Sequence, residues 1–120
     1  MQIHERQIAD VTVLDLEPPY EGVFSKELFQ PHVENLLEEG RRRFVVNLTE
    51  LRWLNSTGIG LLMSAFRLAG QAGATMVFAG ANARITELMR VTGMLQVWES
   101  YEDVESALAG ITAAGSDETN

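Results

Sequence analysis

Alternating runs of apolar and polar residues divide the chain into segments that predict strands and helices. Two nearly continuous apolar runs, FVVNLTEL and TMVFAG, are typical of strands that are buried on both faces of a sheet. The apolar and β-branched residues of VTVLDL also indicate a strand, which Ala9-Asp10 would connect tightly to the segment before it. The five predicted strands, in chain order, are QIHERQI, VTVLDL, FVVNLTEL, TMVFAG and LQVWES.

Four other segments have the apolar spacing of helices, at residues 25–40, 57–71, 83–93 and 102–111. A loop that contains Pro18 and Pro19 separates the second strand from the first helix, because proline is excluded from a central strand. In the first helix, Ser25 is the predicted cap and Gly40 the predicted end. Pro31 is expected in the first turn, because a proline in the middle of a helix would kink it.

The order of these segments, β-β-α-β-α-β-α-β-α, predicts an α/β fold with a small mixed sheet whose central strands are parallel. Residues 1–111 are predicted to form one domain. Residues 112–120 are small, polar and acidic, so we expect a disordered tail. In sheets of this kind, functional residues usually lie at the carboxyl ends of the strands. The stretch LNSTGIG, which follows FVVNLTELRW, falls at that edge.

The chain is acidic and has no cysteine, and both facts narrow the function classes. Its 120 residues include 17 acidic and 9 basic side chains, which gives a formal net charge of −8. An acidic surface repels phosphate backbones, so we expect no nucleic-acid partner and interpret the run 41–43 as a solvated basic loop. The chain does not open like a signal peptide, and no stretch approaches the ~20 apolar residues that span a bilayer. We therefore expect a soluble, cytoplasmic protein without direct membrane insertion.

Residues that carry catalysis do not occur in combinations that predict an enzyme. His4 and His32 lack the spacing of metal ligands, so neither a metal nor another cofactor is expected. Ser56 is not part of a G-x-S-x-G motif, and no motif links it to a histidine. The run Gly58-Ile59-Gly60 lacks the third glycine and the lysine of phosphate-binding loops. The sequence therefore does not support an enzyme.

The polar triplet Asn55-Ser56-Thr57 has two interpretations. All three residue types accept hydrogen bonds from the free N–H groups of a first helical turn, so the triplet could simply cap the helix that follows. However, three such residues are more than one cap needs, and Gly58 and Gly60 would leave the hydroxyl groups accessible. In the alternative interpretation, one of the hydroxyl groups is a regulatory switch.

The helix after the triplet combines a wide apolar surface with a narrow polar one. The stripe predicted to pack on the sheet contains Ile59, Leu62, Met63, Phe66 and Ala69. The polar line contains Gly60, Ser64, Arg67 and Gln71. Such a helix is either deeply buried or leaves part of a face for a partner protein. Of the other large residues, Trp53 and Trp98 are expected in core or rim packing, and Met94 in the loop VTGML could face a partner.

The segment from VVNLTELRWLNSTGIG to GATMVFAGANARITELMRVTG resembles the STAS domain, which is named for sulfate transporters and anti-sigma factor antagonists. The resemblance is closest to the bacterial single-domain anti-sigma factor antagonists. It implies a small sheet with helices packed mainly on one side. It also implies partner switching, in which the unphosphorylated protein binds an anti-sigma factor that is itself a serine-protein kinase, and so frees a sigma factor. Phosphorylation by that kinase ends the binding, and a PP2C-type phosphatase restores it.

By this resemblance, the phosphorylated residue is Ser56, with Thr57 as the second choice. The partner would contact the residues around that position, namely Asn55, Ser56, Thr57, Gly58, Gly60, Ser64, Arg67 and Met94. Phosphorylation adds about −1.5 to −2 charges at neutral pH. The amino terminus of a helix tolerates that charge, whereas an interface packed over the same position does not. The resemblance thus implies a fold that survives phosphorylation and an interface that does not.

Two positions depart from the pattern of regulated STAS proteins. Asn55 stands where these proteins usually carry an aspartate, and Ser25 stands where an aspartate is typical before the first helix. Asparagine caps a helix about as well as aspartate, so the change at position 55 concerns recognition by a kinase rather than the fold. It favours a second hypothesis, an interaction subunit without phosphorylation in a stress-signalling scaffold or a membrane transporter complex. No residue argues specifically for a third class, a small-ligand or nucleotide binder.

Overall fold

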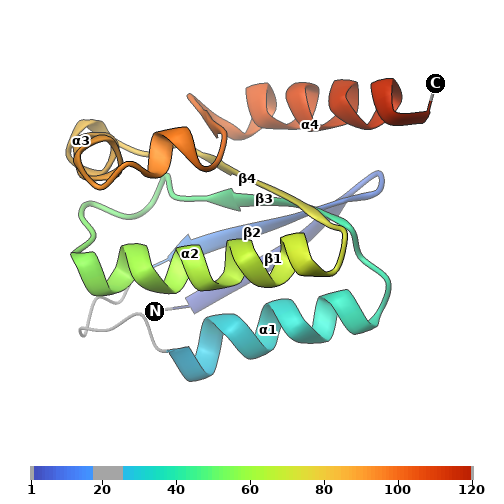
Figure 1. Cartoon of the computed structure of the whole chain (residues 1–120), viewed down its shortest axis with the longest axis horizontal. Coiled ribbons are helices and arrows are strands. Elements are labelled where there is room, and N and C mark those ends of the chain that lie inside the picture. Colours follow the sequence, from blue (N-terminus) through green and yellow to red (C-terminus); the bar gives the residue numbers. More distant parts are fainter. Residues whose placement is uncertain (1, 18–25, 120) are drawn as a thin grey trace.

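The computed structural model in Figure 1 describes the backbone of residues 2–17 and 26–119, and the side-chain surroundings of residues 3–17 and 29–112. The predicted cap Ser25 and the loop that begins at Pro18 lie outside the described residues.

The strands form one mixed sheet in which chain order and spatial order agree. They are β1 (Gln2–Ile8), β2 (Val11–Glu17), β3 (Arg43–Asn47), β4 (Thr75–Ala79) and β5 (Ser100–Tyr101), paired in the order β1-β2-β3-β4-β5. The hairpin of β1 and β2 is antiparallel, and each later pair is parallel. This arrangement confirms the predicted α/β class with parallel central strands.

Helices cover both faces of the sheet, as Figure 1 shows. They are α1 (Lys26–Glu38), α2 (Ser56–Gln71), α3 (Ala83–Val91) and α4 (Val104–Thr119), with the 3-10 helix η1 (Met94–Gln96) after α3. Helices α1, α2 and α3 bury their apolar residues against Leu14, Phe44 and Phe78 on one face. On the other face, α4 packs on a smaller cluster that includes Val13 and Val77. Most of the helices therefore share one side, as expected, and α4 is the one that covers the opposite side.

The prediction of a strand at LQVWES is wrong for most of that segment. Gly93 adopts a left-handed conformation with φ of 81°, which turns the chain sharply after α3. The N–H of Gln96 then donates to the carbonyl of Gly93 at 3.1 Å, which closes a 3-10 turn in place of a strand. This turn directs Trp98 into the core, where it is 3% exposed and its ring centroid lies 4.1 Å from that of Phe78. Strand pairing begins only at Ser100.

The expected position of Pro31 is also wrong. Helix α1 begins at Lys26, so Pro31 lies in the second turn and removes one N–H group from the interior of the helix. The helix continues past it because Phe29 and Val33, on either side, are both buried against the sheet. Pro31 itself is exposed, so its ring does not interrupt that packing.

The boundary of the domain at residue 111 remains a prediction. Ile111 is buried under the sheet face that α4 covers, as expected for the last residue of the core. Helix α4 continues beyond it to Thr119, through the segment that the sequence predicts to be a disordered tail.

The face of α2 that packs on the sheet is rotated from the predicted one. Its buried side chains are Ile59, Leu62, Ala65 and Ala69. The small side chain of Ala65 lets the helix backbone approach the sheet. Phe66, predicted to lie on this stripe, is only half-buried and reaches sideways to Trp98, with 5.8 Å between the ring centroids.

We predict that replacing Leu62 with alanine destabilises the fold and that replacing Arg67 does not. Leu62 is fully buried, and truncation of such a residue typically costs about 2–5 kcal/mol. Arg67 lies on the exposed face of the same helix, where a change usually stays within about 0.5 kcal/mol. Urea unfolding of both variants measures the two costs. A larger loss from Arg67→Ala would contradict the described orientation of α2.

Candidate functional site

The triplet lies at the carboxyl edge of the parallel strands. Strand β3 ends at Asn47, and residues 48–54 lead into α2, which begins at Ser56. The connection from β4 to α3 leaves the same edge of the sheet, as Figure 1 shows. Both strands are buried between the helices of the two faces, so the two loops start from a firmly held base.

Asn55 is the cap of α2. Its backbone is extended, with φ of −104° and ψ of −179°, and its Oδ1 accepts a hydrogen bond from the N–H of Gly58 at 2.8 Å. The carbonyl of Asn55 accepts the first bond within the helix, from the N–H of Ile59 at 3.0 Å. A single residue thus performs the capping that the sequence could assign to any of three.

The hydroxyl groups of Ser56 and Thr57 are therefore not needed for capping. Both residues are exposed, and neither hydroxyl has a hydrogen-bond partner within the described part of the chain. They occupy the first turn of α2, where free N–H groups and the helix dipole favour a negative charge. This arrangement suits a hydroxyl that accepts a phosphate from another protein.

Within the described residues, the two histidines form ion pairs away from these hydroxyl groups. His4 pairs with Glu17 at 3.2 Å, and His32 pairs with Glu5 at 3.1 Å, both pairs involving the hairpin of β1 and β2. Among residues 2–17 and 26–119, no group of three or more histidine, cysteine or acidic side chains could hold a metal ion. The described histidines therefore do not activate Ser56.

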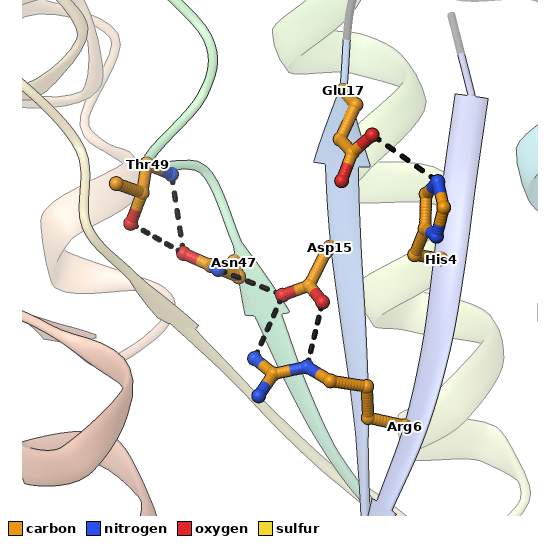
Figure 2. Close-up of polar contacts among 6 residues, drawn as sticks. All are labelled: His4, Arg6, Asp15, Glu17, Asn47 and Thr49. Carbon is orange, nitrogen blue, oxygen red and sulfur yellow. Dashed lines mark hydrogen bonds and ion pairs between the residues drawn. The ribbon is translucent and has the colours of Figure 1, made fainter.

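The first residues of the loop after β3 are fixed by a polar network, drawn in Figure 2. Asp15 on β2 accepts hydrogen bonds from Arg6 Nε at 2.7 Å and Nη2 at 2.9 Å, and from Asn47 Nδ2 at 2.7 Å. The hydrogen bonds from Arg6 to Asp15 raise the pKa of the guanidinium, which keeps its charge. Asn47 Oδ1 in turn accepts from the N–H and the hydroxyl of Thr49, at 3.1 and 2.6 Å. Three strands thus hold the start of the loop.

Asn82 holds the other end of the same loop. Its Nδ2 donates to the carbonyl of Arg52 at 2.8 Å and lies 3.5 Å from that of Leu51. Its Oδ1 accepts from the N–H of Ile85 at 2.9 Å and so caps α3. The loop before the triplet is therefore attached to the sheet at one end and to α3 at the other.

Gly80 allows the two loops to run in contact. It has a positive φ of 80°, which favours glycine. A Cβ atom at this position would lie 2.1 Å from Thr49 Oγ1 and 3.1 Å from the backbone nitrogen of Thr49. The close packing of the loop on β4 and its extension thus requires glycine here.

The structure brings most of the predicted partner-binding residues onto one surface. Ser56, Gly60, Ser64 and Arg67 follow one another along α2, and the Ser64 hydroxyl donates to the carbonyl of Gly60 at 3.1 Å. Asn55 and Thr57 extend this surface around the helix start. Two of the predicted partner-binding residues are not on this exposed surface. Gly58 is buried, and Met94 begins η1 and packs partly against the core.

Two residues near the triplet were not predicted as functional. Trp53 was expected in core or rim packing; it is not part of the core, and it is 44% exposed three residues before Ser56. Asn82 precedes a predicted helix in the sequence GANARI, which marks it as a possible cap. Its contact with residues 51 and 52 spans thirty positions, and no local pattern reveals such a contact.

Comparison with known proteins identifies the family. The sequence profile of the STAS domain matches residues 6–107, and the chain belongs to the STAS domain family. An anti-sigma-B factor antagonist from Listeria monocytogenes is 31% identical over 68 residues, a match that covers 57% of this chain and 59% of that protein. The match thus spans less than two thirds of the relative's length.

Solved structures share the fold at low sequence identity. A variant of RsbS from Moorella thermoacetica superposes with a TM-score of 0.82 at 15% identity, and the match covers 96% of this chain and 98% of that one. The Bacillus cell fate determinant SpoIIAA in its phosphorylated form superposes with a TM-score of 0.70 at 14% identity, covering 92% and 99%. Within residues 2–17 and 26–119, the structure contains no helix that is both long and apolar enough to cross a membrane.

We predict that Gly80→Ala is more destabilising than Gly73→Ala. Both glycines have a positive φ, and an alanine in that conformation costs about 1–2 kcal/mol. A Cβ on Gly73 would meet no atom within 4 Å, whereas one on Gly80 would collide with Thr49, which adds a further ~1–3 kcal/mol. Denaturant unfolding gives the loss in free energy of unfolding for each variant, and the difference between the two losses is the cost of the collision with Thr49. Equal losses would show that Thr49 moves aside freely.

Proposed function

We propose that this protein is an anti-sigma factor antagonist, a binding module that a phosphate on Ser56 switches off. In its unmodified form it binds an anti-sigma factor that is also a serine-protein kinase, and so releases a sigma factor. The observation that carries this proposal is the exposed Ser56 hydroxyl at the start of α2, which is free because Asn55 forms the cap. Membership of the STAS family and the relatives named anti-sigma-B factor antagonists support it.

A phosphate at Ser56 would leave the fold intact and change the surface. It adds about −1.5 to −2 charges at neutral pH, and the free N–H groups of the first turn can donate hydrogen bonds to its oxygens. Ser56 is exposed and belongs to neither apolar cluster, so a phosphate on it displaces no packed side chain. A PP2C-type phosphatase would then restore the unmodified surface.

The proposed partner surface combines small residues with one aromatic residue. Ser56, Gly60 and Ser64 let another protein approach the α2 backbone closely. Trp53, which is 44% exposed three residues before Ser56 in the chain, supplies the kind of side chain that is enriched at the energetic centre of interfaces. A phosphate between these groups would be desolvated on binding without a partner charge, which explains why it would prevent association.

The alternative function is an interaction subunit that is not phosphorylated, in a stress-signalling scaffold or a membrane transporter complex. One observation favours it: Asn55 provides the cap through a neutral amide, so the acceptor serine has no adjacent carboxylate for a kinase to recognise. The two functions predict different partners. Affinity purification of the protein from its host, with identification of bound proteins, would yield an ATP-binding kinase for the first function and transporter or scaffold subunits for the second.

We predict that Ser56→Ala keeps the fold and binds the anti-sigma factor without regulation. Because Asn55 is the cap, the loss of the hydroxyl should change the free energy of unfolding by no more than about 0.5 kcal/mol. Ser56→Asp should also fold, since a carboxylate is favourable at a helix start. It should weaken partner binding about tenfold or more, because an unpaired charge enters the interface. Calorimetry with the purified partner measures both affinities.

Kinase treatment supplies the control for this prediction. The anti-sigma factor and ATP should add one phosphate to the wild type and none to Ser56→Ala, as measured by intact mass. Asn55→Asp, which keeps the capping oxygen and restores a carboxylate, should be phosphorylated at least as fast as the wild type. Wild type that stays unmodified, together with Ser56→Asp that binds as tightly as wild type, would exclude the phosphorylation switch. Phosphate on Thr57 would move the switch by one residue.

A further inference from the structure

The side chain of Asn82 connects the two loops at the carboxyl edge of the sheet. Its two polar atoms act in different directions: Oδ1 caps α3 through the N–H of Ile85, and Nδ2 donates to the carbonyl of Arg52 at 2.8 Å. The two bonds form at the same time, because the donor and the acceptor are different atoms of one amide group. The side-chain amide of asparagine supplies the donor and the acceptor that the two contacts need.

The segment that leads into α2 depends on this contact for its position. Before it, Thr49 is bonded to Asn47, and after it, Asn55 is bonded to Gly58. For residues 52–54, the hydrogen bond that the described structure gives to the rest of the protein is the one from Asn82 to Arg52. Trp53 is 44% exposed and belongs to neither apolar cluster, so the cores do not hold its side chain. The half-buried Leu54 provides the remaining packing.

We propose that Asn82 is a positioning residue for the Ser56 site. By holding the carbonyl of Arg52, it fixes the backbone that carries Trp53 and the cap Asn55, and it joins the amino termini of α2 and α3 into one rigid unit. This proposal rests on the proposed function only for its biological meaning, since the mechanical coupling exists with or without phosphorylation. The partner surface would then include the first turn of α3, which moves together with the acceptor.

An experiment can distinguish the proposed positioning of α2 by Asn82 from its capping of α3. A residue that only caps α3 protects the N–H of Ile85, whereas a positioning residue also protects the N–H of Gly58, which bonds to Asn55 and lies on another helix. Asn82→Asp has nearly the same shape and keeps the capping oxygen. It cannot donate to Arg52, and its carboxylate faces the carbonyl oxygens of Leu51 and Arg52.

The test is amide hydrogen exchange of the isolated protein, followed residue by residue by NMR. We expect Asn82→Asp to speed exchange at Gly58 and Ile59 about five- to tenfold, the change that corresponds to one net hydrogen bond. Exchange at Ile85 should stay within twofold of the wild type. The matched control is Asp103→Ala, which removes the cap of α4 at Ser106, on the other face of the sheet. It should speed exchange at Ser106 and leave Gly58 unchanged.

Two results would overturn the proposal. One is unchanged exchange at Gly58 in Asn82→Asp, and the other is equal acceleration at Gly58 in both variants, which would report a general loss of stability. Neither result depends on a kinase or a partner. If Ser56 proves not to be phosphorylated while Gly58 is deprotected only in Asn82→Asp, the proposed function fails and the positioning role of Asn82 stands.

Discussion

The hydrogen bond from the N–H of Gly58 to Asn55 Oδ1 determines what this edge of the molecule can do. A helix start needs acceptors for its free N–H groups, and nearby hydroxyl groups would supply them if nothing else did. Because the Asn55 amide caps the helix through the N–H of Gly58, the neighbouring hydroxyl groups are not used for that bond and are exposed to solvent. Since Asn55 caps the helix and the adjacent Ser56 does not, the Ser56 hydroxyl can be modified without loss of the helix.

The sheet gives this helix start a rigid base. Strands β3 and β4 have apolar side chains on both faces, packed against α1, α2 and α3 on one side and α4 on the other. The loops that leave their carboxyl ends are then joined by side chains, through Asn47 and Thr49 at one end and through Asn82 at the other. The apolar layers thus position the strands, and a few polar groups position the loops. Disturbing the polar groups would alter the site long before it unfolded the domain.

The sequence predicted those features whose cause is local. The runs FVVNL and TMVFA are apolar except for Asn47 and Thr75, and they supply most of the buried central strands. The alternation in LQVWES misled because Gly93 starts a tight turn, after which Leu95 and Val97 stay exposed and Trp98 is buried. At the site, residue types predicted accessible hydroxyl groups, but they left the cap open among Asn55, Ser56 and Thr57. The contact of Asn82 with Arg52 does not follow from residue types, since it depends on how two loops meet after the sheet has formed.

The neutrality of the helix start has a consequence for the electrostatic potential there. Between Arg52 and Arg67 the chain has no ionisable side chain, so this stretch carries the same formal charge in acid, at neutral pH and in base. An aspartate in place of Asn55 would titrate and would already contribute a negative charge before any modification. Within this stretch, the helix dipole and the covalent state of residue 56 are therefore the local sources of charge. A change of pH alters neither in the unmodified protein, whereas a phosphate adds a negative charge there.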